Sequence, residues 1–221
     1  MDELHPAIAS VDVRGAPLGA SGRVVIILHG VGGNNARFAA FATKAVARVP
    51  GVTILSPRSA FRAWFASDLV RPPAPSGAEM ERALAAVEWT VSQALDAGVP
   101  PGRIVIAGFS QGACLALEHA VRAGRHYAGV LSMSGALLGM GAERGEARRR
   151  WGYSAAGHLA GIPVRLSGHE ADPKVPVRLV RRTHRQLTEL GADVTLRIEP
   201  GDIHKLMPAD GAVLADLVAA R

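Results

Sequence analysis

Hydrophobic residues recur along the chain in short runs that alternate with longer amphipathic stretches. Residues 23–28, RVVIIL, form a continuous apolar run, which is typical of a strand buried on both faces of a sheet. Similar short runs predict further strands at 52–56, 103–108, 129–133, 163–167 and 193–199. Apolar residues at helical spacing predict helices at 37–49, 76–97, 110–122, 177–190 and 211–220. The alternation predicts one domain over residues 1–221, with a mostly parallel central sheet flanked by helices.

Three stretches lack this periodicity. We expect residues 1–14 to form a loosely ordered N-terminus. The other two stretches, residues 57–75 and 137–159, are long irregular segments inside the predicted domain. Long irregular segments in a compact domain are more often functional than accidental. The first one carries Phe61, Trp64 and Phe65. We expect Trp64 and Phe65 to bind substrate, although aromatic residues at such positions can equally be packing residues.

The charge, the lengths of the apolar runs and the single cysteine limit the classes of function that we expect for this chain. The chain has a net charge of +6 and two arginine-rich groups, but no motif of a nucleic-acid-binding domain accompanies them, so we expect no nucleic-acid partner. No apolar run is long enough to span a bilayer, and the first residues do not resemble a secretion signal, which favours a cytoplasmic protein without stable membrane association. The single cysteine, Cys114, excludes an internal disulfide and lies on the apolar stripe of its helix, where we expect a packing residue.

The strongest chemical signal is the sequence Gly108-Phe109-Ser110-Gln111-Gly112. It reads G-x-S-x-G and lies between a predicted strand and a predicted helix, the context of a nucleophile elbow. On such a turn the serine oxygen is presented above the strand ends, near the backbone N–H groups at the helix start. The motif therefore predicts a serine hydrolase with Ser110 as the nucleophile.

A serine hydroxyl at neutral pH needs a base, and the base needs an orienting acid. His204 follows the last predicted strand and a Pro-Gly turn, which makes it the candidate base. Asp172, just past the strand at 163–167, is the candidate acid, with Glu170 and Asp202 as competitors. His119 is set aside because its angle on the helix predicts that it faces outward.

An oxyanion hole is predicted next to this serine. The glycine-rich stretch LHGVGGN, residues 28–34, follows the first buried strand and can aim backbone donors at the carbonyl under attack. We expect the N–H groups of Val31 and Gln111 to serve as the two donors. Glycine-rich loops after a strand also bind phosphates, but the glycine spacing fits neither common nucleotide-binding motif.

Four stretches together resemble the phospholipase/carboxylesterase family of α/β-hydrolases, the group that includes acyl-protein thioesterases. They are LHGVGGN, AGFSQGACLALEHA, the DPKVP stretch from Asp172, and Glu199-Pro200-Gly201 before His204. The resemblance covers residues 15–207 and implies an α/β-hydrolase fold with a Ser-His-Asp site that uses neither metal nor cofactor. The sequence departs from the family where Ile203, instead of a glycine, precedes His204, and it follows the family only loosely over 57–75.

The sequence thus predicts a serine carboxylesterase that acts on small-molecule esters through an acyl-enzyme on Ser110. One alternative keeps the Ser110, Asp172 and His204 site but changes the substrate to a lysophospholipid or an acyl thioester. A second alternative is a binding protein on a hydrolase fold without turnover. The oligomeric state cannot be inferred from sequence.

Overall fold

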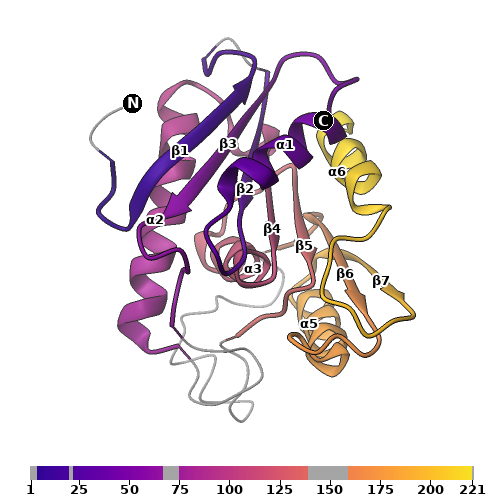
Figure 1. Ribbon diagram of the computed structural model, residues 1–221. Coiled ribbons are helices and arrows are strands. Elements are labelled where there is room, and N and C mark those ends of the chain that lie inside the picture. Colours follow the sequence, from indigo (N-terminus) through magenta and orange to yellow (C-terminus); the bar gives the residue numbers. More distant parts are fainter. Residues whose placement is uncertain (1–3, 20–21, 67–74, 139–158, 221) are drawn as a thin grey trace.

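The computed structural model describes residues 4–19, 22–66, 75–138 and 159–220. Its centre is a seven-stranded sheet in the order β1-β3-β2-β4-β5-β6-β7 (Figure 1). The strands are β1 (Ile8–Gly15), β2 (Arg23–Leu28), β3 (Val52–Ser59), β4 (Ile104–Phe109), β5 (Gly129–Met133), β6 (Pro163–His169) and β7 (Asp193–Glu199). All neighbouring strands pair in parallel except β1 with β3. The prediction of a mostly parallel central sheet is therefore confirmed.

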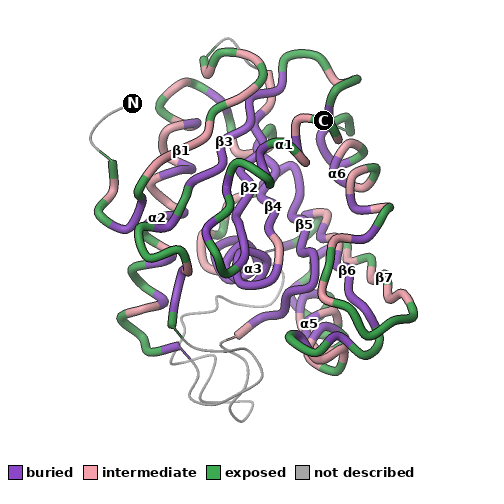
Figure 2. The backbone as a smooth tube through the Cα atoms, in the orientation of Figure 1, coloured by how far each residue is buried: buried purple, intermediate pink, exposed green. Residues whose placement is uncertain are grey.

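Helices cover both faces of this sheet because each central strand sends alternate apolar side chains to opposite sides. Val24, Ile26 and Leu28 of β2 belong to a core cluster that also contains buried residues of α2 (Gly77–Asp96), α3 (Gln111–Ala123) and α5 (Val177–Glu189). Val25 and Ile27, on the other face, belong to a second cluster with buried residues of α1 (Asn35–Ala45) and α6 (Asp210–Ala219). Figure 2 shows the central strands and α3 as buried segments. The start of α3, next to the end of β4, is thus anchored on rigid elements.

The N-terminal segment corrects one prediction. Residues 8–14, part of the N-terminus predicted to be loosely ordered, belong to β1, which pairs antiparallel with β3 from Ile8 to Gly15. As an edge strand, β1 is buried mainly at its start and otherwise alternates between partly exposed and exposed residues. It therefore lacks the continuous apolar run that marks the central strands in the sequence.

His119 on α3 corrects a second prediction, because it is buried and does not face outward. The helix is enclosed on more than its apolar stripe, since α2 packs against it and every residue from Gln111 to Val121 is buried. His119 Nε2 lies 2.9 Å from the Tyr127 hydroxyl, and Glu88 of α2 binds Arg125 through two contacts of 2.6 and 2.7 Å beside them. Burial lowers the pKa of His119 to about 4.

This buried imidazole predicts a pH dependence of stability. Between pH 6.5, its ordinary pKa, and about 4, the unfolded chain binds a proton at His119 that the folded chain does not bind. His119 therefore makes the folded state lose stability as the pH falls through that window, by about 2–3 kcal/mol in total. In urea unfolding curves, His119→Gln should show a smaller loss of stability than the parent between pH 6.5 and 4.

The matched control is His126→Gln, at an exposed histidine in the neighbouring turn. This variant should keep the parental pH dependence. An equal pH dependence in the parent and His119→Gln would show that His119 is not held neutral.

Candidate active site

Ser110 occupies a sharp turn between β4 and α3. Its backbone has φ 55° and ψ −121°, a left-handed φ that is rare for a residue with a side chain. The turn is fixed on both sides, because the Ser110 N–H donates to the Met133 carbonyl of β5 at 2.9 Å and the Ser110 carbonyl accepts from the Cys114 N–H at 3.0 Å. The serine is thereby held above the carboxyl ends of the central strands, where ligands bind in open parallel sheets.

The two glycines of the motif are required by close backbone contacts. A Cβ atom at Gly108 would collide with the carbonyl group of Gly112, the second residue of α3. A Cβ atom at Gly112 would collide with the carbonyl groups of Leu28, the last residue of β2, and of His29, which follows it. Both glycines of the G-x-S-x-G pattern are therefore needed because the start of α3 lies so close to β4 and to the end of β2.

The structure brings together the three residues that chain order predicts as a catalytic set. His204 Nε2 lies 2.8 Å from Ser110 Oγ, and His204 Nδ1 lies 2.8 Å from Asp172 Oδ2. When Nδ1–H donates to the carboxylate, Nε2 is left unprotonated and can accept the proton of the serine hydroxyl. The ring of His204 also packs against Phe109, with 4.8 Å between the ring centroids. His204 makes both contacts with Ile203 in place of the family's glycine, and Ile203 is 43% exposed.

Asp172 is oriented by backbone groups. Its side chain is 1% exposed, and its Oδ1 accepts the N–H groups of Lys174 at 2.8 Å and Val175 at 3.0 Å. The other oxygen, Oδ2, is the one that faces His204. Its two competitors from the sequence, Glu170 and Asp202, are exposed. The structure thus places Asp172, of the three acids, against the imidazole.

The glycine-rich loop after β2 is braced by the segment that follows β3. The Gly32 N–H donates to the Arg62 carbonyl at 2.9 Å, and Arg62 Nε donates to the Gly32 carbonyl at 3.2 Å. His29, at the loop's start, lies with Nδ1 2.6 Å from the Gly30 carbonyl, while its Nε2 accepts the Ser59 N–H at 3.0 Å. One nitrogen donates and the other accepts, so this ring is neutral, and burial lowers its pKa. No pattern in the sequence predicts this bracing role of His29.

The Gln111 side chain links the elbow to the same segment. Its Oε1 accepts the Trp64 N–H at 2.9 Å, and its Nε2 donates to the Phe65 carbonyl at 2.7 Å. Trp64 stacks on His29 with 4.8 Å between ring centroids, and its Nε1–H donates to the His29 carbonyl at 2.8 Å. The sequence predicts that Trp64 binds substrate. In the structure it instead packs against His29 at the start of the glycine-rich loop, because its indole N–H donates to the His29 carbonyl.

A cavity of about 410 Å³ opens beside Ser110. Phe65, but not Trp64, belongs to its lining. Val31 also borders the cavity, and the residue is 73% exposed. Other lining residues are Phe109, Ser110, Gln111, Lys174 and His204. Phe109 and Lys174 were not singled out in the sequence, although both adjoin predicted site residues.

Cys114, one turn beyond Ser110, is fully buried, as predicted for a packing residue. Burial raises the pKa of its thiol to about 12, and its Sγ accepts the Ala136 N–H at 3.3 Å. A thiol in this state is not a nucleophile at neutral pH. The irregular stretch at 137–159, with Trp151 and one arginine-rich group, lies almost entirely outside the described residues.

The sheet order, the helices on both faces and the serine at the β4–α3 turn define an α/β-hydrolase fold. Residues 16–211 match the sequence model of the phospholipase/carboxylesterase family. The chain belongs to that family, and the predicted fold class is confirmed.

Individual relatives agree with this assignment. A phospholipase/carboxylesterase from Dyadobacter fermentans has a crystal structure that is 26% identical, covers 98% of both chains and superimposes with a TM-score of 0.82. Esterase PE8, 22% identical over 96% of this chain and 98% of its own, shares the fold with a TM-score of 0.78. Acyl-protein thioesterase 1 of Neurospora crassa is 28% identical over 131 residues, which are 59% of this chain and 51% of that protein. The chain spans about half the length of the curated relatives it matches.

Proposed function

We propose that this chain is a serine carboxylesterase that hydrolyses small carboxylic esters through an acyl-enzyme on Ser110, without metal or cofactor. The observation that carries the proposal is the continuous series of contacts from Ser110 Oγ to His204 and on to Asp172, each of 2.8 Å. This series lies at a cavity, where an ester can reach the hydroxyl. The family and its relatives named as esterases support the same reaction class.

The proposed reaction has two acyl-transfer steps. Ser110 Oγ attacks the ester carbonyl while His204 Nε2 takes the serine proton, and Asp172 stabilises the imidazolium that forms. The backbone N–H groups of Val31 and Gln111 stabilise the negative oxygen of the tetrahedral intermediate, a contribution of about 3 kcal/mol per donor. His204 then gives the proton to the leaving alcohol. Water, activated by the same imidazole, attacks the acyl-enzyme and releases the acid.

The bracing contacts have a role in this scheme. An oxyanion donor is effective when it is held in place before the reaction begins. The hydrogen bonds between Gly32 and Arg62 hold the loop that carries Val31, the first proposed donor. Gln111, the second proposed donor, is held by the hydrogen bonds of its own side chain to the backbone of Trp64 and Phe65. Both proposed donors are thereby attached to one segment, residues 59–65.

The size of the cavity supports small esters as substrates. Its volume of about 410 Å³ lies toward the lower end of the range for small-molecule sites, about 300–1,000 Å³. No helix among the described residues is both long and apolar enough to cross a membrane. The relatives named acyl-protein thioesterase make an acyl thioester the second candidate substrate for the same residues. The cytoplasmic location and the absence of a nucleic-acid partner stay predictions.

A substrate panel tests the proposed function. We expect p-nitrophenyl acetate and butyrate to be hydrolysed with burst kinetics, and longer acyl chains to be hydrolysed more slowly. A matched butyryl thioester separates ester from thioester preference. Binding of these compounds without turnover would instead support a binding protein on a hydrolase fold.

A further inference from the structure

The described lining of the cavity is largely apolar and includes one lysine, Lys174, an exposed residue on the loop after β6. Apart from the proposed reacting groups and Gln111, the lining described by the structure consists of glycine, alanine, valine and phenylalanine residues together with Lys174. It includes no aspartate or glutamate among the described residues. No sequence motif predicts a role for this lysine, and its side chain takes no part in the proposed acyl-transfer steps.

The nearest carboxylate in sequence does not neutralise this charge. Asp172 uses Oδ1 for the backbone N–H groups of Lys174 and Val175, and it uses Oδ2 for His204. Its carboxylate is thus committed to other partners in a nearly fully buried position. Within the described part of the chain, the ion pairs of carboxylates involve arginines and histidines and leave Lys174 without a partner.

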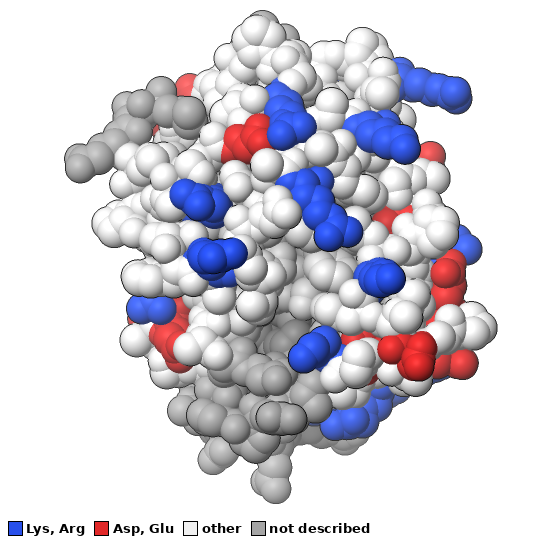
Figure 3. All heavy atoms as spheres, in the orientation of Figure 1, with Lys and Arg blue, Asp and Glu red and all other residues white. Residues whose placement is uncertain are grey.

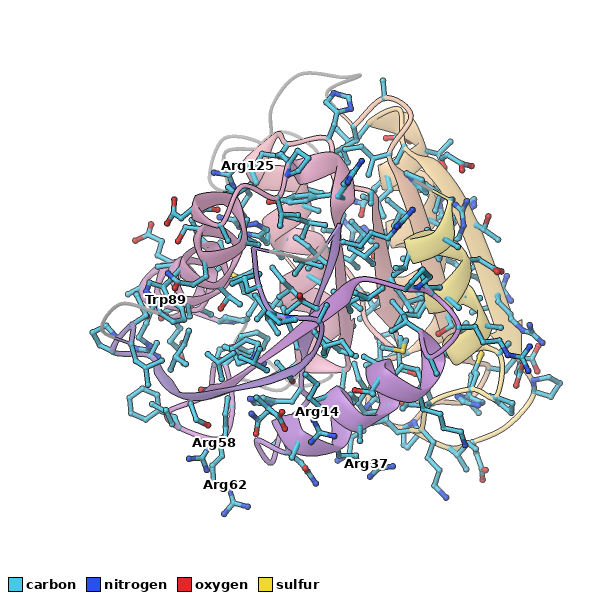
Figure 4. All side chains as sticks on the ribbon, turned by 90° about the horizontal axis from the view of Figure 1, so that it is seen from above. Arg14, Arg37, Arg58, Arg62, Trp89 and Arg125 are labelled. Atoms are coloured by element: carbon cyan, nitrogen blue, oxygen red, sulfur yellow. The ribbon has the colours of Figure 1, made fainter. Side chains whose placement is uncertain are left out.

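The surroundings of the cavity add to the positive potential. Arg62 donates to the Gly32 carbonyl of the glycine-rich loop whose Val31 borders the cavity, and Arg58 lies near the end of β3, just before the segment that carries Arg62. Figure 4 shows Arg58 and Arg62 projecting away from the body of the protein on the side where Arg37 also projects. Figure 3 shows Lys and Arg side chains above and beside the hollow in that face, with Asp and Glu side chains further out at the lower left and lower right. Clustered charge of one sign raises the local concentration of oppositely charged ligands.

We propose that Lys174 is a specificity-determining residue that selects esters carrying an anionic group, a carboxylate or a phosphate, near the scissile bond. The inference rests on the proposed esterase function and names the substrate class of that site. The ammonium group binds the anion of the substrate while Ser110 attacks the ester carbonyl. Because Lys174 shares the Asp172 loop, the bound anion and the His204–Asp172 pair are positioned by the same backbone.

Two matched pairs of esters test the inference and separate the two places where the anion can lie. Mono-p-nitrophenyl succinate against p-nitrophenyl butyrate places the charge on the acyl side. The pair p-acetoxybenzoate against p-acetoxybenzamide places the charge on the alcohol side. For each pair the measured quantity is the ratio of kcat/KM for the anionic ester to kcat/KM for the neutral ester.

We expect this ratio to fall about tenfold in Lys174→Met, and further in Lys174→Glu, for at least one of the two pairs. Lys44→Met removes the same charge from α1, away from this cavity, and should leave both ratios within about twofold of the parent. Ratios that are equal in the parent, Lys174→Met and Lys174→Glu would overturn the inference while leaving the esterase intact. Failure of the parent to hydrolyse any of the four esters would overturn the proposed function and the inference with it.

Discussion

Ser110→Ala should abolish ester hydrolysis, with kcat reduced by roughly 10⁴- to 10⁶-fold. The substitution removes the one atom that the proposed mechanism uses as a nucleophile, and the neighbouring groups cannot replace it. The protein should still fold, because alanine differs from serine only by that hydroxyl and meets a similar strain at φ 55°. The measurement is kcat on p-nitrophenyl butyrate together with the thermal unfolding midpoint of both proteins.

Ser134→Ala is the matched control for this substitution. Ser134 is also buried, has a similar φ of 51°, and follows the neighbouring strand β5, but it is not part of the cavity lining among the described residues. It should retain most of the activity. If Ser110→Ala kept more than about one hundredth of the parental kcat, Ser110 would not be the nucleophile.

Asp172→Asn should reduce kcat by about 10⁴-fold at neutral pH while leaving the protein folded. The reason is the direction of two hydrogen bonds. Since Oδ1 accepts the N–H groups of Lys174 and Val175, the amide oxygen of an asparagine would keep that position and its NH₂ group would face His204. The imidazole would then accept at Nδ1 and carry its proton on Nε2, so it could no longer take the proton from Ser110.

The controls for Asp172 are the two acids that compete with it in the sequence. Asp202→Asn and Glu170→Gln change exposed side chains on the loops that carry His204 and Asp172. Each should retain kcat within about threefold of the parent. A larger loss in either of these variants than in Asp172→Asn would assign the orienting acid to the other residue.

The sequence predicts the central part of the fold because its signals there are local. The strands β2 and β4 are continuous apolar runs, and they lie in the middle of the sheet with helices on both sides. The edge strand β1 is not predicted, since an edge strand that faces solvent needs no such run. His119 is misplaced for a related reason, because the helical stripe argument assumes one buried face whereas α3 is enclosed.

At the site, chain order and the elbow motif are sufficient to predict the residues that the structure brings together, Ser110, Asp172 and His204. Long-range contacts are not predicted. The Gln111 side chain binds backbone groups 46 and 47 residues away, and no sequence pattern records such a pair. For the same reason the sequence does not distinguish Phe65, which lines the cavity, from Trp64, which packs on His29. The position of Lys174 in the cavity likewise depends on how the loop after β6 folds.

Covalent labelling tests the central claim, that Ser110 is an activated nucleophile, most directly. The folded parent protein is treated with a fluorophosphonate, and the modified peptide is identified by mass spectrometry, with Ser110→Ala treated in parallel. We expect one adduct, on Ser110, and no adduct in Ser110→Ala. A folded parent protein that does not react, or an adduct on a different serine, would contradict the claim.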